Sequence, residues 1–110
     1  MKNQENKIAA NKRLAELLGW SHIAEVGGAL VGTPPVGVAE CRGQAMVPDW
    51  LGDWAAAAPL LALFEIRLMP MSAGVDAGGF LEWYRFYQDK DTAVRVALVK
   101  AVTHRLQRAR

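Results

Sequence analysis

The sequence has a single cysteine, a small net charge and no long apolar run, and each shortage excludes a class of protein. Cys41 is the one cysteine, so no disulfide can form within the chain. The 13 basic and 11 acidic side chains leave a formal charge of +2, which argues against a nucleic-acid binder, because such proteins usually carry a strongly basic face. The longest apolar stretch, from Trp54 to Phe64, is well short of the ~18 residues that a membrane span needs.

Sequence motifs for common chemistry are also absent. The chain has no phosphate-binding loop, dinucleotide fingerprint, paired metal-ligand spacing or nucleophile elbow. His22 and His104, the only histidines, have no cysteine or carboxylate at a ligand spacing. Cys41 beside Arg42 is either a reactive thiol or a small buried residue, and the second reading is favoured because no general base is recognisable. We therefore expect no catalytic residue, no metal and no cofactor, and a protein that is not an enzyme.

Length and composition favour one domain over residues 1–110. The 110 residues, 52% of them hydrophobic, are enough to enclose a core without a metal or a disulfide. Residues 1–5 are polar and are expected to be frayed. No signal peptide is visible, which predicts a location in a reducing cytoplasm. Residues 36–48 show no period and are expected to form a long loop, with a short strand considered within 37–41.

Apolar residues at helical spacing predict three helices. The first covers about residues 6–18 and ends at Gly19. The second begins at a cap formed by Asp49 or Asp53 and runs to about residue 63, with Pro59 either kinking it or splitting it in two; a kink is favoured. The third follows a cap at Asp91 and runs to about residue 107.

Strand patterns fall between these helices. Gly27-Gly28 separates two short apolar runs and predicts a hairpin over about residues 23–31. Residues 64–69 alternate between apolar and polar, residues 72–79 are expected to be a flexible turn, and the aromatic-rich residues 80–88 are expected to be a strand. The order is α-β-β-α-β-β-α. We therefore predict an α+β fold, with an antiparallel sheet of about four strands layered with three helices.

A group of large aromatic residues is the strongest candidate for a binding surface. Core packing accounts for part of this set, and tryptophan and tyrosine are enriched where proteins bind one another. The basic end of the last helix is a further candidate, for an acidic partner. The residues expected to contact a partner are Trp50, Trp54, Trp83, Tyr84 and Tyr87, together with Arg42 in the long loop.

Three blocks of the sequence resemble the phage ABA sandwich domain, a family of small phage and prophage proteins. The opening helix that ends in Gly-Trp (Asn11–Trp20), the proline turn with an alanine-rich helix (Val47–Phe64) and the closing alanine-rich helix (Asp89–Val102) follow the family's order. Pro59 within the middle helix departs from the family's pattern, and so does a longer segment at 36–46. The family has no established catalytic residues to carry over.

This resemblance implies a phage or prophage accessory protein in the bacterial cytoplasm. The expected partner is a host protein or protein complex, and inhibition of a host defence complex, in the manner of an anti-CRISPR protein, is the leading hypothesis. The alternative is a domain that binds a small ligand or nucleotide between sheet and helices, with the glycine-rich loops at its rim. A homodimer through the aromatic strand at residues 80–87 stays open.

Overall fold

A computed structural model describes residues 4–35 and 43–109, and the elements in this part confirm the α+β fold. Within these residues there are three α-helices and two antiparallel sheets of three strands each. In chain order the elements are α1 (Gln4–Leu17), β1 (Ser21–Val26), β2 (Ala29–Thr33), β3 (Ala45–Met46), α2 (Trp54–Phe64), β4 (Leu68–Pro70), β5 (Gly74–Ala77), β6 (Phe80–Trp83), the 3₁₀ turn η1 (Tyr84–Phe86) and α3 (Lys90–Arg108).

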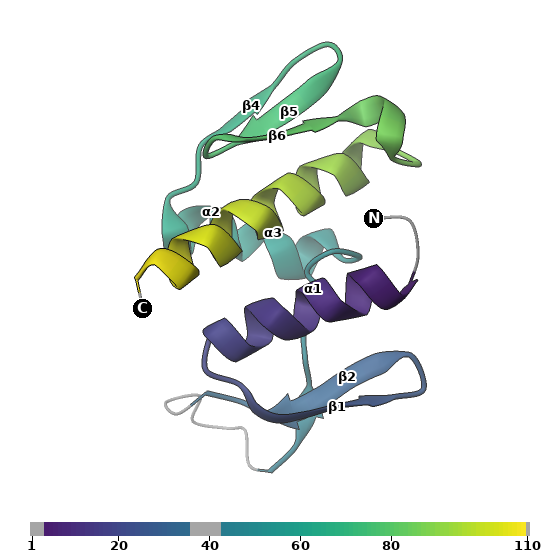
Figure 1. Ribbon diagram of the computed structural model, residues 1–110, viewed down its shortest axis with the longest axis vertical. Coiled ribbons are helices and arrows are strands. Elements are labelled where there is room, and N and C mark those ends of the chain that lie inside the picture. The colour runs from purple at the N-terminus through teal and green to yellow at the C-terminus, as the bar shows by residue number, and fades with distance from the viewer. Residues whose placement is uncertain (1–3, 36–42, 110) are drawn as a thin grey trace.

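The helices lie between the two sheets (Figure 1). The β1-β2-β3 sheet lies beyond α1 at one end of the molecule, and the β4-β5-β6 sheet covers α3 at the other end. α3 also contacts α1 and α2, so it is enclosed on several sides. Seven of its residues are buried as a result: Ala93, Val96, Ala97, Leu98, Val99, Ala101 and Val102. One hydrophobic cluster therefore extends from the first sheet, through the layer of helices, to the second sheet.

The prediction of a single sheet of about four strands is wrong. The first hairpin pairs with a third strand, β3, whereas β5 lies between the two later predicted strands, which do not pair with each other. The helices keep the two sheets apart. β3 lies in the expected loop, and β5 lies in the expected flexible turn at 72–79. β5 is the central strand of its sheet, where Val75 and Ala77 are completely buried. The strand considered at 37–41 lies outside the described residues.

Two expected strands begin or end elsewhere. α2 continues through Phe64 and ends at Glu65, which adopts a left-handed conformation (φ 53°), so β4 starts only at Leu68. The aromatic strand ends at Trp83, because the chain turns into η1 at the next residue. The hairpin at Gly27-Gly28 is confirmed, since both glycines have positive φ, as the tight turn requires.

The helix caps resolve the choice that the sequence left open at α2, and they show that the predicted Asp91 cap of α3 is wrong. Asp53 caps α2 and accepts a hydrogen bond from the Ala55 amide at 3.0 Å. α2 then continues past Pro59 as one helix. Asp89, rather than Asp91, caps α3, because its carboxylate accepts bonds from the Thr92 amide and hydroxyl at 2.7 Å each.

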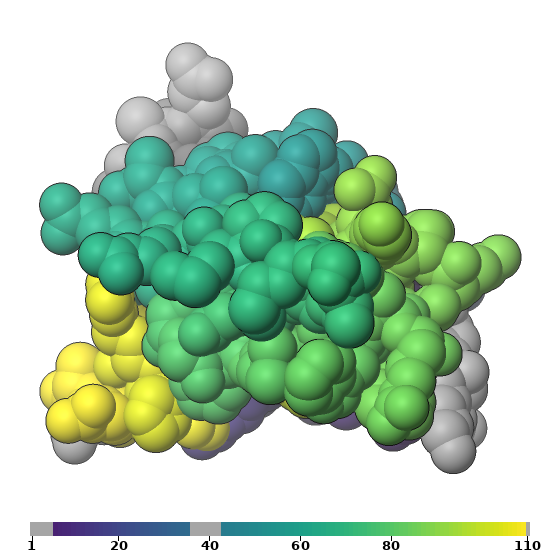
Figure 2. Space-filling model, turned by 90° about the horizontal axis from the view of Figure 1, so that it is seen from above, coloured from purple at the N-terminus to yellow at the C-terminus, as the bar shows by residue number. Residues whose placement is uncertain are grey.

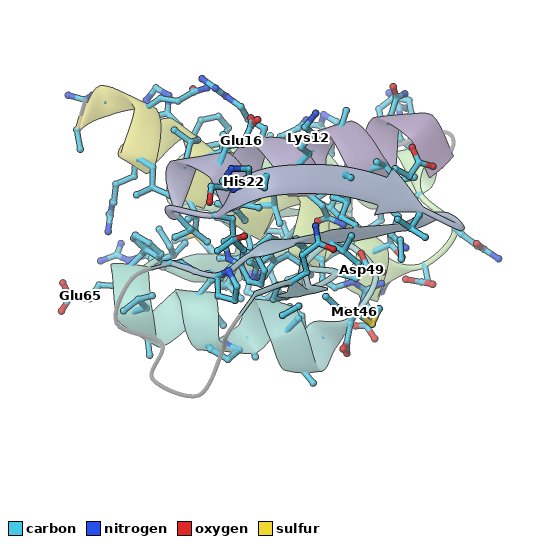
Figure 3. All side chains as sticks on the ribbon, turned by 90° about the horizontal axis from the view of Figure 1, so that it is seen from below. Lys12, Glu16, His22, Met46, Asp49 and Glu65 are labelled. Carbon is cyan, nitrogen blue, oxygen red and sulfur yellow. The ribbon has the colours of Figure 1, made fainter. Side chains whose placement is uncertain are left out.

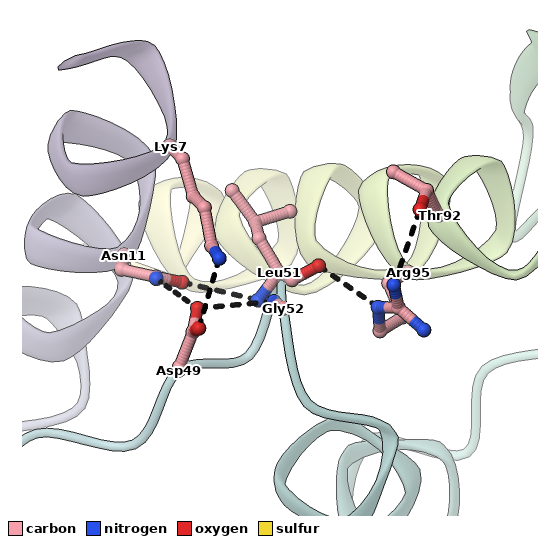
Figure 4. A network of polar contacts seen from close by, with 7 residues as sticks. All are labelled: Lys7, Asn11, Asp49, Leu51, Gly52, Thr92 and Arg95. Carbon is pink, nitrogen blue, oxygen red and sulfur yellow. Dashed lines mark hydrogen bonds and ion pairs between the residues drawn. The ribbon is translucent and has the colours of Figure 1, made fainter. Parts of the chain in front are cut away.

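Asp49 joins the segment before α2 to α1 (Figure 4). Its carboxylate accepts a hydrogen bond from the Asn11 amide at 2.8 Å and one from the Gly52 backbone at 3.0 Å, and it lies 3.0 Å from the Lys7 ammonium. Asn11 is itself only 5% exposed, and its carbonyl oxygen accepts from the Leu51 amide. An alanine in place of Gly52 would displace both charged groups, so this position favours glycine.

The same segment is tied to α3 from its other side. The Arg95 guanidinium donates to the Leu51 carbonyl oxygen at 2.8 Å. Partial burial raises the pKa of Asp49, but the hydrogen bonds from Lys7 and Asn11 and the charge of Lys7 outweigh it, so the pKa lies below its usual value. We call the contacts among Lys7, Asn11, Asp49, Leu51 and Arg95 the polar bridge.

Replacement of the central carboxylate tests the polar bridge. A lowered pKa means that the Asp49 carboxylate stabilises the fold above its ordinary pKa of about 4, and that this contribution is lost as the pH falls through the folded value. We expect Asp49→Asn to lower the free energy of unfolding by about 1 kcal/mol near neutral pH, a figure discounted for partial exposure. The difference from wild type should shrink below about pH 4.

Urea unfolding, followed by tryptophan fluorescence at a series of pH values, measures this difference. Asp91→Asn is the matched control, because Asp91 is an exposed aspartate in the first turn of α3. A difference between Asp49→Asn and wild type that stays constant down to about pH 3 would contradict a contribution from the charge.

Candidate protein-binding surface

The β4-β5-β6 sheet buries one face against α3 and leaves the other uncovered. Side chains alternate between the two faces of a strand, so the fully buried Val75 and Ala77 mark the inner face. Asp76, between them, points to the outer face, and its cross-strand neighbours are Met69 and Leu81. The next outward pair is Gly74 and Trp83.

The outer side is rich in exposed apolar side chains. We define the outer apolar face by the residues that share this side of the sheet and its borders: Met69, Met71, Leu81 and Trp83, with Phe86 on the adjoining turn. The first four of these residues are 43–46% exposed, and Phe86 is 63% exposed. Figure 2 views the molecule from this side, and no other element within residues 4–35 and 43–109 lies over the sheet. Large exposed apolar patches on a small protein are typical of interaction surfaces.

The Trp83 ring packs closely on the sheet because its cross-strand neighbour is a glycine. Gly74 is its cross-strand neighbour, and a Cβ built on Gly74 would lie 3.3 Å from the indole ring and 2.6 Å from the Glu82 backbone oxygen. Without a side chain at Gly74, the ring can lie close over the backbone. One surface of the indole therefore contacts the sheet, while the other remains accessible.

The inner face fixes the position of β6 and η1. Glu82 points toward α3, where its carboxylate lies 2.6 Å from the Lys100 ammonium and also accepts a hydrogen bond from the Tyr87 hydroxyl. Burial raises the pKa of Tyr87, and the bond to Glu82 and its charge raise it further. Phe80 contacts the His104 ring, with 5.3 Å between the ring centres. These contacts anchor the strand that presents Leu81 and Trp83 outward.

A hollow adjoins the outer apolar face at Trp83. It has a volume of about 440 Å³, and its lining residues are Ser72, Ala73, Trp83, Tyr84, Arg85 and Lys90. The Lys90 ammonium lies 5.2 Å from the centre of the Tyr84 ring, and the Arg85 guanidinium lies 4.8 Å from that of Phe86. The hollow thus combines two aromatic rings with two cations. We call it the aromatic-cationic hollow.

The structure brings together only part of the predicted contact set. Trp83 and Tyr84 both line the hollow, and Tyr87 is half-buried beside them in the chain with its hydroxyl bonded to Glu82. Trp50 is 5% exposed and belongs to the core, so its indole is not available to a partner. Trp54 is 42% exposed but begins α2, away from the sheet. Arg42 lies outside the described residues, as does Cys41.

The sequence analysis did not single out Met69, Met71 and Leu81. The alternation over residues 64–69 placed Met69 opposite the apolar side chains, which was a usable signal. No sequence signal indicated that Leu81 points outward, because both sides of its strand hold apolar residues and the register was ambiguous. Met71 falls between the predicted strand at 64–69 and the predicted turn at 72–79, so no pattern indicated its direction.

The described residues hold no cluster of metal ligands, and their hollows of about 300 Å³ or more are open to solvent rather than enclosed. Those residues contain no group of three histidine, cysteine, aspartate or glutamate side chains that could hold a metal ion. None of their helices is both long and apolar enough to cross a bilayer. A pocket next to the Gly28 turn, bordered by Lys7, Asn11, Met46 and Asp49, holds about 160 Å³, whereas ligand sites usually span about 300–1,000 Å³.

Comparisons with known proteins do not extend this picture. A scan against protein-family models, a search of curated proteins and a search of solved structures each return no match for the chain.

The two tryptophans that we assigned to one contact surface should differ sharply in their effect on stability. We expect Trp50→Ala to lower the free energy of unfolding by about 3–5 kcal/mol, because it leaves a cavity in the core. Trp83→Ala should cost about 1 kcal/mol, because its ring is partly exposed and contacts mainly the strand below it. Urea unfolding followed by circular dichroism measures both, and equal losses would contradict the assignment of Trp50 to the core.

Proposed function

We propose that the chain is a non-enzymatic protein that binds a protein partner through the outer apolar face. The observation that carries this proposal is the row of exposed apolar side chains on one side of a sheet whose other side packs against α3, with Val75 and Ala77 completely buried. Covering this face would remove apolar surface from water, which is the main favourable contribution to most protein association. Met69, Leu81 and Trp83 are its central anchors.

Rigidity supports the same proposal. The strand that carries Leu81 and Trp83 is held from below by the Glu82–Lys100 pair, and the indole rests on Gly74. A binding surface that is already ordered loses less side-chain entropy when a partner arrives. Asp76 in the middle of the face accepts a hydrogen bond from the Gly79 amide at 2.8 Å, so its carboxylate is also oriented before binding.

The alternative, a small-ligand or nucleotide domain, receives less support. The pocket beside Gly28 is too small for a nucleotide. Gly78 borders two open hollows: one of about 300 Å³ on the outer side of the sheet, with Arg67, Met69 and Asp76, and one of about 360 Å³ beside His104 and Arg105 of α3. We therefore favour a surface for a macromolecule over an enclosed ligand site.

The biological setting of the proposal comes from the sequence resemblance described above. It is that of a phage or prophage accessory protein, acting in a bacterial cell on a host protein complex. Blocking a defence complex, as anti-CRISPR proteins do, is the form of action we propose. A rigid apolar face suits this action, because a small protein can obstruct a larger complex by occupying one of its surfaces without chemistry of its own.

Lysine substitutions in the outer apolar face test the proposal. We expect the double variant Met69→Lys, Leu81→Lys to retain the fold, because both positions neighbour Asp76 across the strands and opposite charges are tolerated there. The same variant should lose at least about tenfold in partner affinity, because the new charges must be desolvated on binding. Affinity capture from bacterial lysate, with quantitative mass spectrometry, measures this loss.

The matched control adds two lysines to the opposite sheet. Met46 is 70% exposed and Val26 is 61% exposed, and the sheet that carries them lies at the other end of the molecule (Figure 3, where Met46 is labelled). Met46→Lys, Val26→Lys should capture the same proteins as wild type. Equal capture by all three folded proteins would refute the outer apolar face as the binding site.

A further inference from the structure

We infer that the aromatic-cationic hollow receives an acidic segment of the protein partner, with an apolar or aromatic side chain inserted beside Trp83 and a carboxylate paired with Arg85 or Lys90. This inference rests on the proposed function and adds the chemistry of the partner. It follows from three features of the hollow: its unpaired cations, its apolar lining and its continuity with the outer apolar face.

The two cations have no carboxylate partner among the described residues. Within residues 4–35 and 43–109, the ion pairs are Lys7–Asp49 and Lys100–Glu82. Arg85 and Lys90 contact aromatic rings instead, which leaves their charge to be balanced by solvent ions. The carboxylate of Asp89, next to Lys90, caps α3 and is bonded to Thr92. Two cations in one hollow therefore favour an incoming anionic group.

The rest of the lining fits one side chain. Trp83 and Tyr84 provide aromatic rings to the lining. Ser72 and Ala73 are small, so they leave space in the hollow beside those rings. The volume of about 440 Å³ is enough for a large side chain and part of the backbone that carries it, although the hollow is open to solvent. A buried aromatic or aliphatic anchor in such a hollow is a common hot spot of protein interfaces.

Trp83 connects the hollow to the outer apolar face, so one partner can cover both. A nucleic acid would fit this combined surface less well than a protein. Its phosphate backbone would meet the Asp76 carboxylate at the centre of the outer apolar face, between Met69 and Leu81, where no cation neighbours Asp76 across the strands. The chain's net charge of +2 also gives little general attraction for a polyanion. An acidic protein segment therefore satisfies the surface better.

A peptide titration of the full chain tests the inference. The main probe is a seven-residue peptide with a central leucine flanked by aspartates and glutamates and with both ends blocked. The comparison probes are the same peptide with lysines in place of the acidic residues, and an eight-nucleotide oligothymidine. In ¹⁵N-correlated NMR spectra, we expect the acidic peptide to shift the amide signals of Ala73, Tyr84 and Arg85 and the Trp83 indole signal, and both comparison probes to leave them in place.

Charge reversal then assigns the effect to the hollow. Arg85→Glu and Lys90→Glu should each weaken the acidic peptide about tenfold at low salt, because an attractive pair becomes a repulsive one. Lys12→Glu is the matched control for Lys90→Glu, since it makes the same charge change on an exposed position of α1 (labelled in Figure 3). It should leave the peptide affinity within about twofold.

Three results would overturn the inference: no shift at the hollow with the acidic peptide, equal shifts with the lysine peptide, or shifts with oligothymidine alone. Partner capture distinguishes its failure from that of the proposed function. If Met69→Lys, Leu81→Lys loses the partner while Arg85→Glu and Lys90→Glu keep wild-type capture, the outer apolar face stands as the binding site and the acidic segment is refuted. If neither change affects capture, both proposals fail.

Discussion

The buried amide of Asn11, beside the Lys7–Asp49 ion pair, joins α1 to the segment that precedes α2. It donates to the Asp49 carboxylate and accepts from the Leu51 amide, while Arg95 of α3 holds the Leu51 carbonyl from the opposite side. The segment that leads from the first sheet to α2 is thereby fixed between α1 and α3 (Figure 4). Because unpaired polar groups are costly in a core, this arrangement tolerates little change in the position of that segment.

The separation of the two sheets follows from this constraint. With α1 and α3 held together, the first hairpin packs on the outer side of α1, and the later strands pack on the free side of α3. Among the described residues, each sheet then buries one face against helices and has no second layer on its other face. In the β4-β5-β6 sheet, that uncovered side carries methionine, leucine and tryptophan side chains, and this combination is the reason for assigning binding to it.

The helices and the first hairpin could be predicted from sequence because their signals are local. Apolar spacing, aspartate caps and the Gly27-Gly28 pair each act within a few residues. β5 could not be predicted, because Gly74, Asp76 and the Gly78-Gly79 pair favour a turn and only the strands on either side make it a central strand. The same distinction between local signals and tertiary packing applies to the candidate site. Trp83 and Tyr84 are conspicuous in the sequence, whereas the burial of Trp50 and the outward direction of Leu81 depend on tertiary packing.

The central claim is that the outer apolar face contacts another protein, and site-specific photo-crosslinking tests it most directly. A photoreactive phenylalanine analogue would replace Leu81 in one variant and Met46 in another, and both would be illuminated in bacterial cells. Our account predicts one discrete adduct with a different protein from position 81 and none from position 46. An adduct at twice the chain mass of 12.0 kDa would mean that a second copy covers the face. That result, or the same pattern from both positions, would contradict the account.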